Sequence, residues 1–323
     1  MKPLCGIILG CIIPYFRKKS KSFSEKKTQK PFIFSKKYDK IKEIGKRGDV
    51  VTYRELCGQL SAGGIEAAEF EAECLLEDLC GADRSRILSE PDRDYPSAAL
   101  ERALARRLGH EPLQYILGTW SFYRGTFRVS PDCLIPRADT EVLVEEAIRR
   151  LPRGAYFADL CTGSGCIGIA TLAERPDTRA LGVDLSQGAL EIAAENAVRN
   201  GVSDRFRLLR ADLLTAAPGE HGRFDAILSN PPYIRSDVVD TLSAEVRHEP
   251  RMALDGGADG LVFYRALLRL AETSLNDGGF CLFEIGYDQG EEIRALAASH
   301  GFACEVKRDL GGQDRVAVLT RGA

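Results

Sequence analysis

The four residues Asn230-Pro231-Pro232-Tyr233 combine groups that could hold a planar amide or amine. They follow residues 224–229, an apolar run typical of a buried strand. Neither proline has an N–H to donate, so the chain leaves the strand stiff and extended. The Asn230 side-chain oxygen and the Pro231 carbonyl could accept from an NH2 group, while Tyr233 covers its flat face. This combination predicts a site that methylates an amide or an exocyclic amine. The alternative is a proline turn without a function.

A second group of residues could hold a cofactor. Asp159-Leu160-Cys161-Thr162-Gly163-Ser164-Gly165 closes a predicted strand and opens a helical pattern. Glycines let the backbone approach a ligand closely, and the N–H groups at a helix start point toward it. Gly163, Gly165 and Gly168 also match the dinucleotide fingerprint, which leaves NAD as an alternative cofactor.

Two further carboxylates follow the next two predicted strands. Asp184 stands where a carboxylate can accept from both ribose hydroxyls, a contact that NAD and S-adenosylmethionine share. Asp212, with Leu213, stands where an adenine would lie, although Asp212 could instead only cap a turn. Asp159 favours S-adenosylmethionine, because a carboxylate before the glycines suits a cationic sulfonium and amino group better than a pyrophosphate. We therefore predict S-adenosylmethionine, with Asn230 completing its site.

These residues require a sheet whose parallel strands end side by side. Strand and helix patterns alternate from Tyr156 onward, which predicts a doubly wound, mostly parallel α/β sheet. The short connection from Asp309 to Asp314 requires the last two strands to pair antiparallel. The expected strands are 156–160, 179–183, 206–210, 224–229, 279–285, 304–308 and 315–320, and the expected helices are 165–173, 187–200, 260–274 and 289–299.

A small helical domain is expected before the sheet. Thr52 and Glu55 have the spacing of a capping box. Residues 66–80 and 97–108 have helical periodicity, and charges such as Arg106-Arg107 are expected on a solvated face.

Aromatic residues and glycines fill the stretch that follows, which predicts a short hairpin bridging the two domains. Asp139 or Thr140 is then expected to cap a helix. The predicted organisation is a basic extension (1–48), a helical substrate-docking domain (49–112), a hairpin linker (113–137) and a catalytic domain (138–323).

Charge divides the 323-residue chain sharply at its start. Residues 1–48 hold 14 basic and 3 acidic residues, a net charge of +11, whereas the remainder holds 30 basic and 44 acidic residues, a net charge of −14. We expect residues 1–48 to be a disordered extension or the product of a start site placed too far upstream. The acidic body argues against a nucleic-acid groove, and the 14-residue apolar stretch Pro3 to Phe16 is short for a membrane span.

Ten cysteines are scattered without a C-x-x-C pair, and only four histidines are present. This usage predicts no metal site and a reducing, cytoplasmic compartment rather than a disulfide framework.

Taken together, the motifs resemble the HemK/PrmC family of class I, Rossmann-like methyltransferases over roughly residues 50–320. The resemblance rests on the order and spacing of several segments. They are 112–118, 135–141, the glycine loop, Asn230 to Tyr233 with Ile234, Glu249-Pro250, Ala253-Leu254, 259–261, Glu284-Ile285-Gly286 and 309–316.

The resemblance implies a seven-stranded fold and transfer of a methyl group from S-adenosylmethionine to a glutamine amide. The implied substrate is the Gly-Gly-Gln motif of peptide chain release factors, with an enzyme that is a monomer and uses no metal. A sister branch modifies a ribosomal protein, but Gln114 to Gly118 and the helical domain favour the release-factor branch. Ala138 and Cys161 depart from the family, which usually has proline and glycine there.

Three other functions stay open. N-P-P-Y also occurs in DNA adenine methyltransferases, which would need a basic groove and a recognition domain. An NAD oxidoreductase would leave Asn230 to Tyr233 without a purpose. The third is a cofactor-binding module without turnover that docks on ribosomal factors through residues 49–110.

Overall fold

The computed structural model describes residues 50–215 and 222–321, so the predicted extension at 1–48 lies outside the described residues. The chain divides into two compact units, one ending at Gly109 and the other beginning at His110. The domain boundaries at residues 48, 112 and 137 remain predictions.

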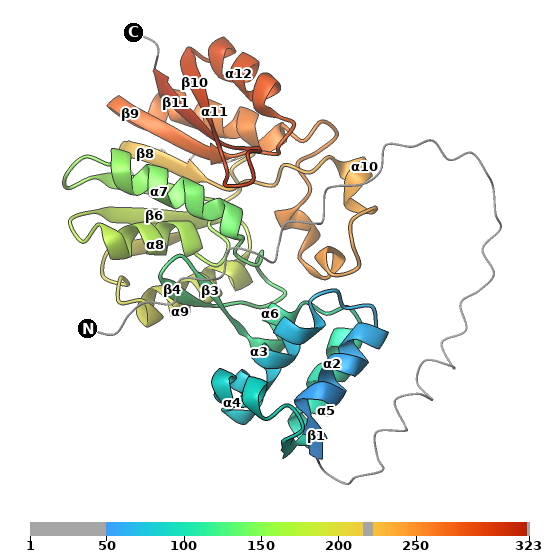
Figure 1. Ribbon diagram of the computed structural model, residues 1–323. Coiled ribbons are helices and arrows are strands. Elements are labelled where there is room, and N and C mark those ends of the chain that lie inside the picture. Colours follow the sequence, from blue (N-terminus) through green and yellow to red (C-terminus); the bar gives the residue numbers. More distant parts are fainter. Residues whose placement is uncertain (1–49, 216–221, 322–323) are drawn as a thin grey trace, which may run out of the picture. The chain divides into compact units, whose positions relative to one another are not determined.

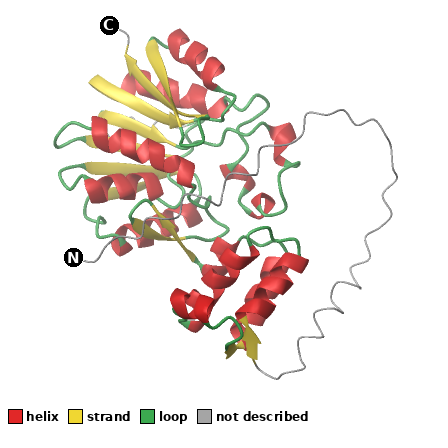
Figure 2. Ribbon diagram, in the orientation of Figure 1, coloured by secondary structure: helices red, strands yellow, loops and turns green. Residues whose placement is uncertain are grey.

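The first unit is mainly helical (Figure 2). Its helices are α2 (Tyr53–Ala62), α3 (Ala68–Cys80), α4 (Arg84–Ser89) and α5 (Ser97–Leu108). The predicted capping box at Thr52 and Glu55 is confirmed, with both of its reciprocal hydrogen bonds present. A two-stranded sheet of β1 (Val50–Thr52) and β2 (Asp94–Pro96) was not predicted, because three-residue strands carry little periodicity.

Arg107 is buried, so the expectation that it lies on a solvated face is wrong. Its side chain is only 3% exposed and lies against Glu71, with an Nε to Oε2 distance of 2.5 Å. Arg106, its neighbour, is exposed as predicted. Successive residues of a helix point about 100° apart, so a pair of arginines can place one side chain inside and one outside.

The second unit contains a seven-stranded sheet in the order β10-β11-β9-β8-β5-β6-β7 (Figure 1). The central strands are parallel, and the last two strands, β10 and β11, pair antiparallel as predicted. β11 also pairs antiparallel with β9, which was not predicted. The strands are β5 (Tyr156–Leu160), β6 (Arg179–Asp184), β7 (Phe206–Arg210), β8 (Phe224–Ser229), β9 (Leu275–Glu284), β10 (Phe302–Arg308) and β11 (Asp314–Arg321). The doubly wound fold class is confirmed.

Shorter elements complete this unit. The predicted hairpin is present as the antiparallel strands β3 (Thr119–Phe122) and β4 (Gly125–Arg128). The helices are α6 (Leu113–Leu117), α7 (Glu141–Arg150), α8 (Cys166–Glu174), α9 (Gln187–Arg199), α10 (Ser236–Val239), α11 (Val262–Ser274) and α12 (Gly290–Ser299), with 3-10 turns η2 (Ala138–Thr140), η4 (Val246–His248) and η5 (Arg251–Ala253). In the described part of the chain, no helix combines the length and apolar character needed to cross a bilayer.

Both faces of the sheet are buried. Neighbouring strand residues alternate between two cores: Phe157 packs with α7 and α8, whereas Ala158 packs with α11 and α12. Side chains of a strand point alternately to its two faces, so a strand covered by helices on both sides reads as a continuous apolar run. This explains why residues 224–229 could be predicted as a buried strand.

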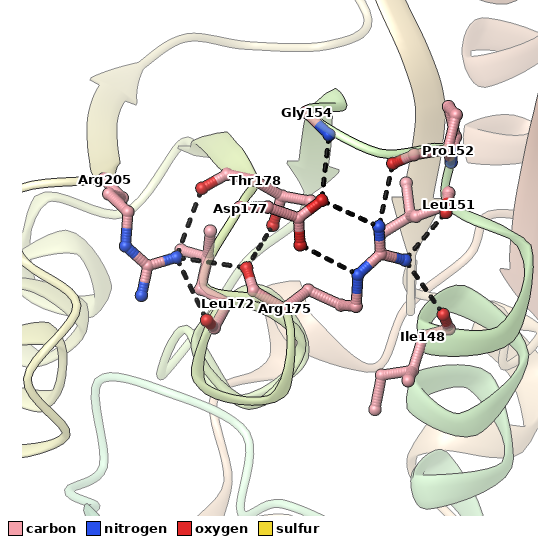
Figure 3. Close-up of polar contacts among 9 residues, drawn as sticks. All are labelled: Ile148, Leu151, Pro152, Gly154, Leu172, Arg175, Asp177, Thr178 and Arg205. Carbon is pink, nitrogen blue, oxygen red and sulfur yellow. Dashed lines mark hydrogen bonds and ion pairs between the residues drawn. The ribbon is translucent and has the colours of Figure 1, made fainter.

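A guanidinium network fastens the edge where the parallel strands begin (Figure 3). Arg175 follows α8 and donates to the carbonyls of Ile148, Leu151 and Pro152 at distances of 2.7–3.0 Å. It also pairs with Asp177, whose carboxylate accepts from Gly154 N.

Arg205 closes the same edge from the start of β7. Its Nη1 donates to the carbonyls of Leu172, Arg175 and Thr178 (Figure 3). Together the two arginines satisfy carbonyls at the ends of α7 and α8 that have no partner within their helices.

Candidate active site

The predicted site residues meet where the strand order reverses. β5 lies between β8 and β6, and Leu160 at the end of β5 pairs with Ser229 at the end of β8. Asn230 and Cys161 therefore leave the sheet side by side. Ligands of open α/β sheets bind at such a switch point, outside the carboxyl ends of the strands.

The backbone of Asn230 to Tyr233 is held from behind. Ile234 N donates to Leu254 O, and Gly256 N donates to Ile234 O, at 3.0 and 2.8 Å. A Cβ on Gly256 would come within 2.7 Å of Tyr233 Cα, so only glycine allows this close approach. Gln289 Nε2 also donates to Tyr233 O at 3.1 Å. These contacts fix the position of the motif without using its predicted acceptors.

Two acceptors of the motif remain available. Among the described residues, none donates a hydrogen bond to Asn230 Oδ1 or to Pro231 O. The Asn230 side chain is half-buried, and its Nδ2 donates to Thr140 Oγ1 at 3.4 Å. The amide nitrogen is thus engaged by the protein, and the carbonyl oxygen is left for a ligand.

Tyr233 is half-buried against the core on the α11 side. Its hydroxyl donates to Glu284 Oε1 at 3.4 Å, and burial raises the pKa of the phenol. Tyr233 is therefore a neutral, oriented ring rather than a base. Its predicted role as the cover of an amide plane remains a proposal.

The glycine loop after β5 is built around Asp159. This carboxylate is fully buried, and its Oδ2 accepts from Thr162 Oγ1 at 2.6 Å and from Gly168 N at 2.9 Å. Its Oδ1 is buried and has no partner, and the same is true of Ser164 Oγ. Burial raises the pKa of Asp159 to about 7. An unpaired buried carboxylate oxygen favours a cationic group nearby.

Cys161 has a left-handed backbone, with φ of 58°. This conformation favours glycine, because a Cβ there approaches the following carbonyl oxygen. The departure from the family's usual glycine therefore places a strained residue beside the loop. Gly163 is also left-handed, and a Cβ built on it would meet no atom within 4 Å, so this part of the loop faces open space.

Asp184 and Asp212 differ in the hydrogen bonds that they accept from the main chain. Asp184 Oδ2 accepts from Gly163 N at 2.8 Å and Oδ1 accepts from Ser186 N at 2.9 Å, while burial raises its pKa. Asp212 Oδ1 accepts from Leu214 N at 2.9 Å, which is the turn contact considered as its alternative role. Leu213 packs at the border of the α11-side core. Asp184 is the last residue of β6, and Asp212 follows the adjacent strand β7.

The structure adds Thr140 and Glu284 to the predicted residues. Thr140 directly precedes α7, as expected of a cap, but its side chain makes no capping bond. Its hydroxyl donates instead to Glu284 Oε2 at 2.6 Å. Both side chains are 1% exposed. The segment Glu284-Ile285-Gly286 carried part of the family resemblance, and that was the only sequence signal for Glu284.

Glu249, which is also a buried carboxylate, connects its own segment to residues 135–141. Glu249 accepts from Ile135 N at 3.0 Å and pairs with Arg137 Nη2. Arg137 has an extended backbone, with φ of −101° and ψ of 142°. Proline at residue 138 would accept that conformation of its predecessor, so Ala138 departs from the family without changing the local geometry.

Comparison with known proteins shows two matching protein families. Residues 52–118 match the PrmC N-terminal domain family, and residues 138–276 match the methyltransferase small domain family. A release factor glutamine methyltransferase of Geobacter sulfurreducens is 43% identical over 264 residues, which cover 80% of this chain and 92% of the relative. The protein of the same name from Moorella thermoacetica is 42% identical over 82% of this chain and 97% of its own length.

The chain belongs to the release factor glutamine methyltransferase family. A solved structure of a release-factor-specific protein-(glutamine-N5) methyltransferase from Alicyclobacillus acidocaldarius is 35% identical over 61% of this chain and all of that chain. Its TM-score is 0.38, so the class I fold assignment rests on the family match and the strand order of the enzyme itself.

Proposed function

We propose that the enzyme transfers a methyl group from S-adenosylmethionine to the side-chain amide nitrogen of the glutamine in the Gly-Gly-Gln motif of a peptide chain release factor. The observation that carries this proposal is the pair of free acceptors, Asn230 Oδ1 and Pro231 O, beside the glycine loop. The relatives named for this substrate support it.

The residues around the glycine loop fit the cofactor. Bound S-adenosylmethionine supplies an electrophilic methyl group on a positively charged sulfur. Asp159 Oδ1 is a buried acceptor without a partner, which suits the cationic end of such a molecule. Asp184 and Asp212 would face the ribose and adenine, and the open side of Gly163 allows a ligand to approach the backbone.

Orientation is the main catalytic device in this proposal. A carboxamide nitrogen is a weak nucleophile because its lone pair is delocalised into the carbonyl. Asn230 Oδ1 and Pro231 O would each accept one N–H of the substrate amide, which aims the nitrogen at the methyl group. Positive charge that builds on the nitrogen in the transition state is then stabilised by two fixed oxygens.

The bonds made and broken balance without another reactant. The nitrogen–carbon bond forms as the carbon–sulfur bond breaks, and the sulfur keeps the bonding electron pair. The proton leaves the nitrogen for solvent afterwards. Tyr233 would pack on the amide plane, and Pro232 would keep the backbone extended.

A labelling experiment tests the proposed substrate. The full-length enzyme is incubated with S-adenosylmethionine carrying a labelled methyl group and, in separate reactions, with a release factor, ribosomal proteins or DNA, and the modified residue is mapped by mass spectrometry. We expect label on the Gly-Gly-Gln glutamine, and none on a release factor in which that glutamine is replaced by alanine. Label on a ribosomal protein or on DNA adenine would instead support one of the alternative substrates.

The cofactor site is tested by Asp184→Asn. Asparagine still offers Gly163 N an acceptor but loses the second acidic oxygen, so we expect about 10- to 100-fold weaker cofactor binding. Isothermal titration calorimetry measures it, with Asp177→Asn at the opposite edge as the matched control. Equal affinity of both variants would remove Asp184 from the cofactor site.

A cytoplasmic location also belongs to this proposal. The eight cysteines of the described residues are all free thiols, which suits a reducing compartment.

A further inference from the structure

Thr140 and Glu284 are not part of the predicted site, yet Thr140 contacts Asn230 directly and Glu284 contacts it through Thr140. Ser229 pairs with Phe283 across β8 and β9, so the next residues, Asn230 just after β8 and Glu284 at the end of β9, are neighbours. Thr140 lies between them, 3.4 Å from Asn230 Nδ2 and 2.6 Å from Glu284 Oε2. All three side chains belong to the second unit of the chain.

The Glu284 carboxylate fixes the direction of both hydrogen bonds in the series Glu284–Thr140–Asn230. A carboxylate oxygen can only accept, so the Thr140 hydroxyl must give its single hydrogen to Glu284. The Thr140 oxygen can then only accept, and the amide group that faces it must be the Asn230 NH2. The Asn230 carbonyl oxygen consequently points the other way, where no described residue donates to it.

We propose that Thr140 and Glu284 are positioning residues for methyl transfer, holding the Asn230 side chain with its carbonyl oxygen toward the substrate. Without them an asparagine amide could rotate by 180° and present two donors to a substrate NH2 group. This inference rests on the proposed function of Asn230. Tyr233, which donates to the other Glu284 oxygen, would be oriented by the same carboxylate.

The surroundings of Glu284 make this arrangement sensitive to pH. Burial is the main cause that raises the pKa of Glu284 to about 7; within that shift Asp139 also raises the pKa, while Thr140, Arg315 and Tyr233 lower it. Arg315 is not a dedicated partner of Glu284, because it pairs with Asp309 at 3.0 Å and with Asp139 at 3.5 Å.

The other titratable groups facing Glu284 are Tyr264 on α11 and Cys166 on α8, which burial keeps neutral. When Glu284 takes up a proton it can donate to Thr140, and the Thr140 hydrogen is then free to turn toward Asn230 Oδ1. The orientation of Asn230 is therefore lost as the pH falls through about 7.

The decisive comparison is between two threonine-to-valine changes. Thr140→Val removes the hydroxyl and keeps the shape of the side chain. Thr171→Val makes the same change at a fully buried hydroxyl without a partner, on α8. With a release factor as substrate, we expect Thr140→Val to lower kcat about 10- to 100-fold, while the KM for cofactor stays within about twofold. We expect Thr140→Ser to retain kcat and Thr171→Val to leave it unchanged.

Glu284→Gln adds two measurements, the pH dependence of kcat and the effect of a double variant, that a merely structural role of Glu284 would not change in the way we expect. If Glu284 acts through Thr140, adding Glu284→Gln to Thr140→Val should lower kcat no further, and Glu284→Gln alone should abolish the loss of kcat below about pH 7. Additive effects, a retained acid limb, or equal kcat for Thr140→Val and Thr171→Val would each overturn the inference. If Glu284→Gln does not fold, the Thr140→Val and Thr140→Ser pair still decides.

Failure of this inference and failure of the proposed function look different. An inactive Asn230→Ala with fully active Thr140→Val would reject the positioning role alone. An active Asn230→Ala would reject the role of Asn230 itself.

Discussion

At the edge where the parallel strands begin, Arg175 donates to three main-chain carbonyls and to Asp177, and Arg205 donates to three more. At the edge where the strands end, Asn230 Oδ1 and Pro231 O have no donor among the described residues, and Asp159 Oδ1 is buried without a partner. The first edge uses its polar groups within the fold. The second leaves them for a ligand and bears the cost of the buried carboxylates Asp159, Glu249 and Glu284 and of a left-handed cysteine.

The largest expected effect on catalysis is at the carboxyl edge. Asn230→Ala removes one of two fixed acceptors, so we expect kcat to fall by about 10²- to 10³-fold, or about 3 kcal/mol in barrier. The midpoint of thermal unfolding should change little, because Asn230 makes only one long hydrogen bond to the protein. Methyl transfer to a release factor near the wild-type rate would show that Asn230 is not the amide acceptor.

The buried carboxylates predict an unusual dependence of stability on pH. Asp159 and Glu284 both have their pKa raised to about 7, so the folded state retains their protons where the unfolded state has lost them. Their contribution is complete below about pH 4 and is lost as the pH rises to about 7, by up to about 4 kcal/mol for each group. Urea unfolding of the cofactor-free enzyme between pH 4 and 8 measures it, and Asp159→Asn should flatten the curve.

Asp177 at the opposite edge predicts the opposite sign. Arg175 and Gly154 N lower the pKa of this carboxyl, so its contribution is present above about pH 4 and is lost on further acidification. Asp177→Asn should therefore weaken the loss of stability in acid and leave the slope between pH 4 and 7 unchanged. If Asp159→Asn and Asp177→Asn changed the slope of stability against pH in the same way, the two edges would not differ in how their carboxylates affect stability.

At the amino edge the expected effect is on stability alone. Arg175→Met leaves three carbonyls without their donor and should lower the free energy of unfolding by about 2 to 3 kcal/mol. At a temperature where the variant is folded, kcat should match the wild type. A loss of kcat without a loss of stability would instead link this network to the reaction.

The smallest expected effect concerns the strained cysteine. Cys161→Gly should raise the free energy of unfolding by about 0.5 to 1 kcal/mol, because glycine adopts a φ of 58° without a Cβ clash. Cys161→Ala is the matched control, since it removes the thiol and keeps the Cβ. Equal stability of the glycine and alanine variants would argue that the left-handed backbone stores no strain.

Periodicity predicted most elements well. Ser97–Leu108 was expected from its apolar spacing and is a helix over the same residues. The start of β9 was wrong by four residues, because Asn276 to Gly279 has the composition of a turn. In the structure this stretch continues the strand through a shift in register, with Gly278 left-handed and Asn276 Nδ2 bonded to Asp225 Oδ1 at 2.7 Å.

The sequence by itself determined which polar residues follow each strand, because buried parallel strands read as apolar runs that end at Asp159, Asp184, Asp212 and Asn230. Only the tertiary structure decided which of their atoms are free. Thr140 is 90 residues from Asn230 and 144 residues from Glu284, and the contacts depend on the parallel register of β8 and β9. A threonine before a helix reads locally as a cap, and burial beside Glu284 turned it toward the site instead.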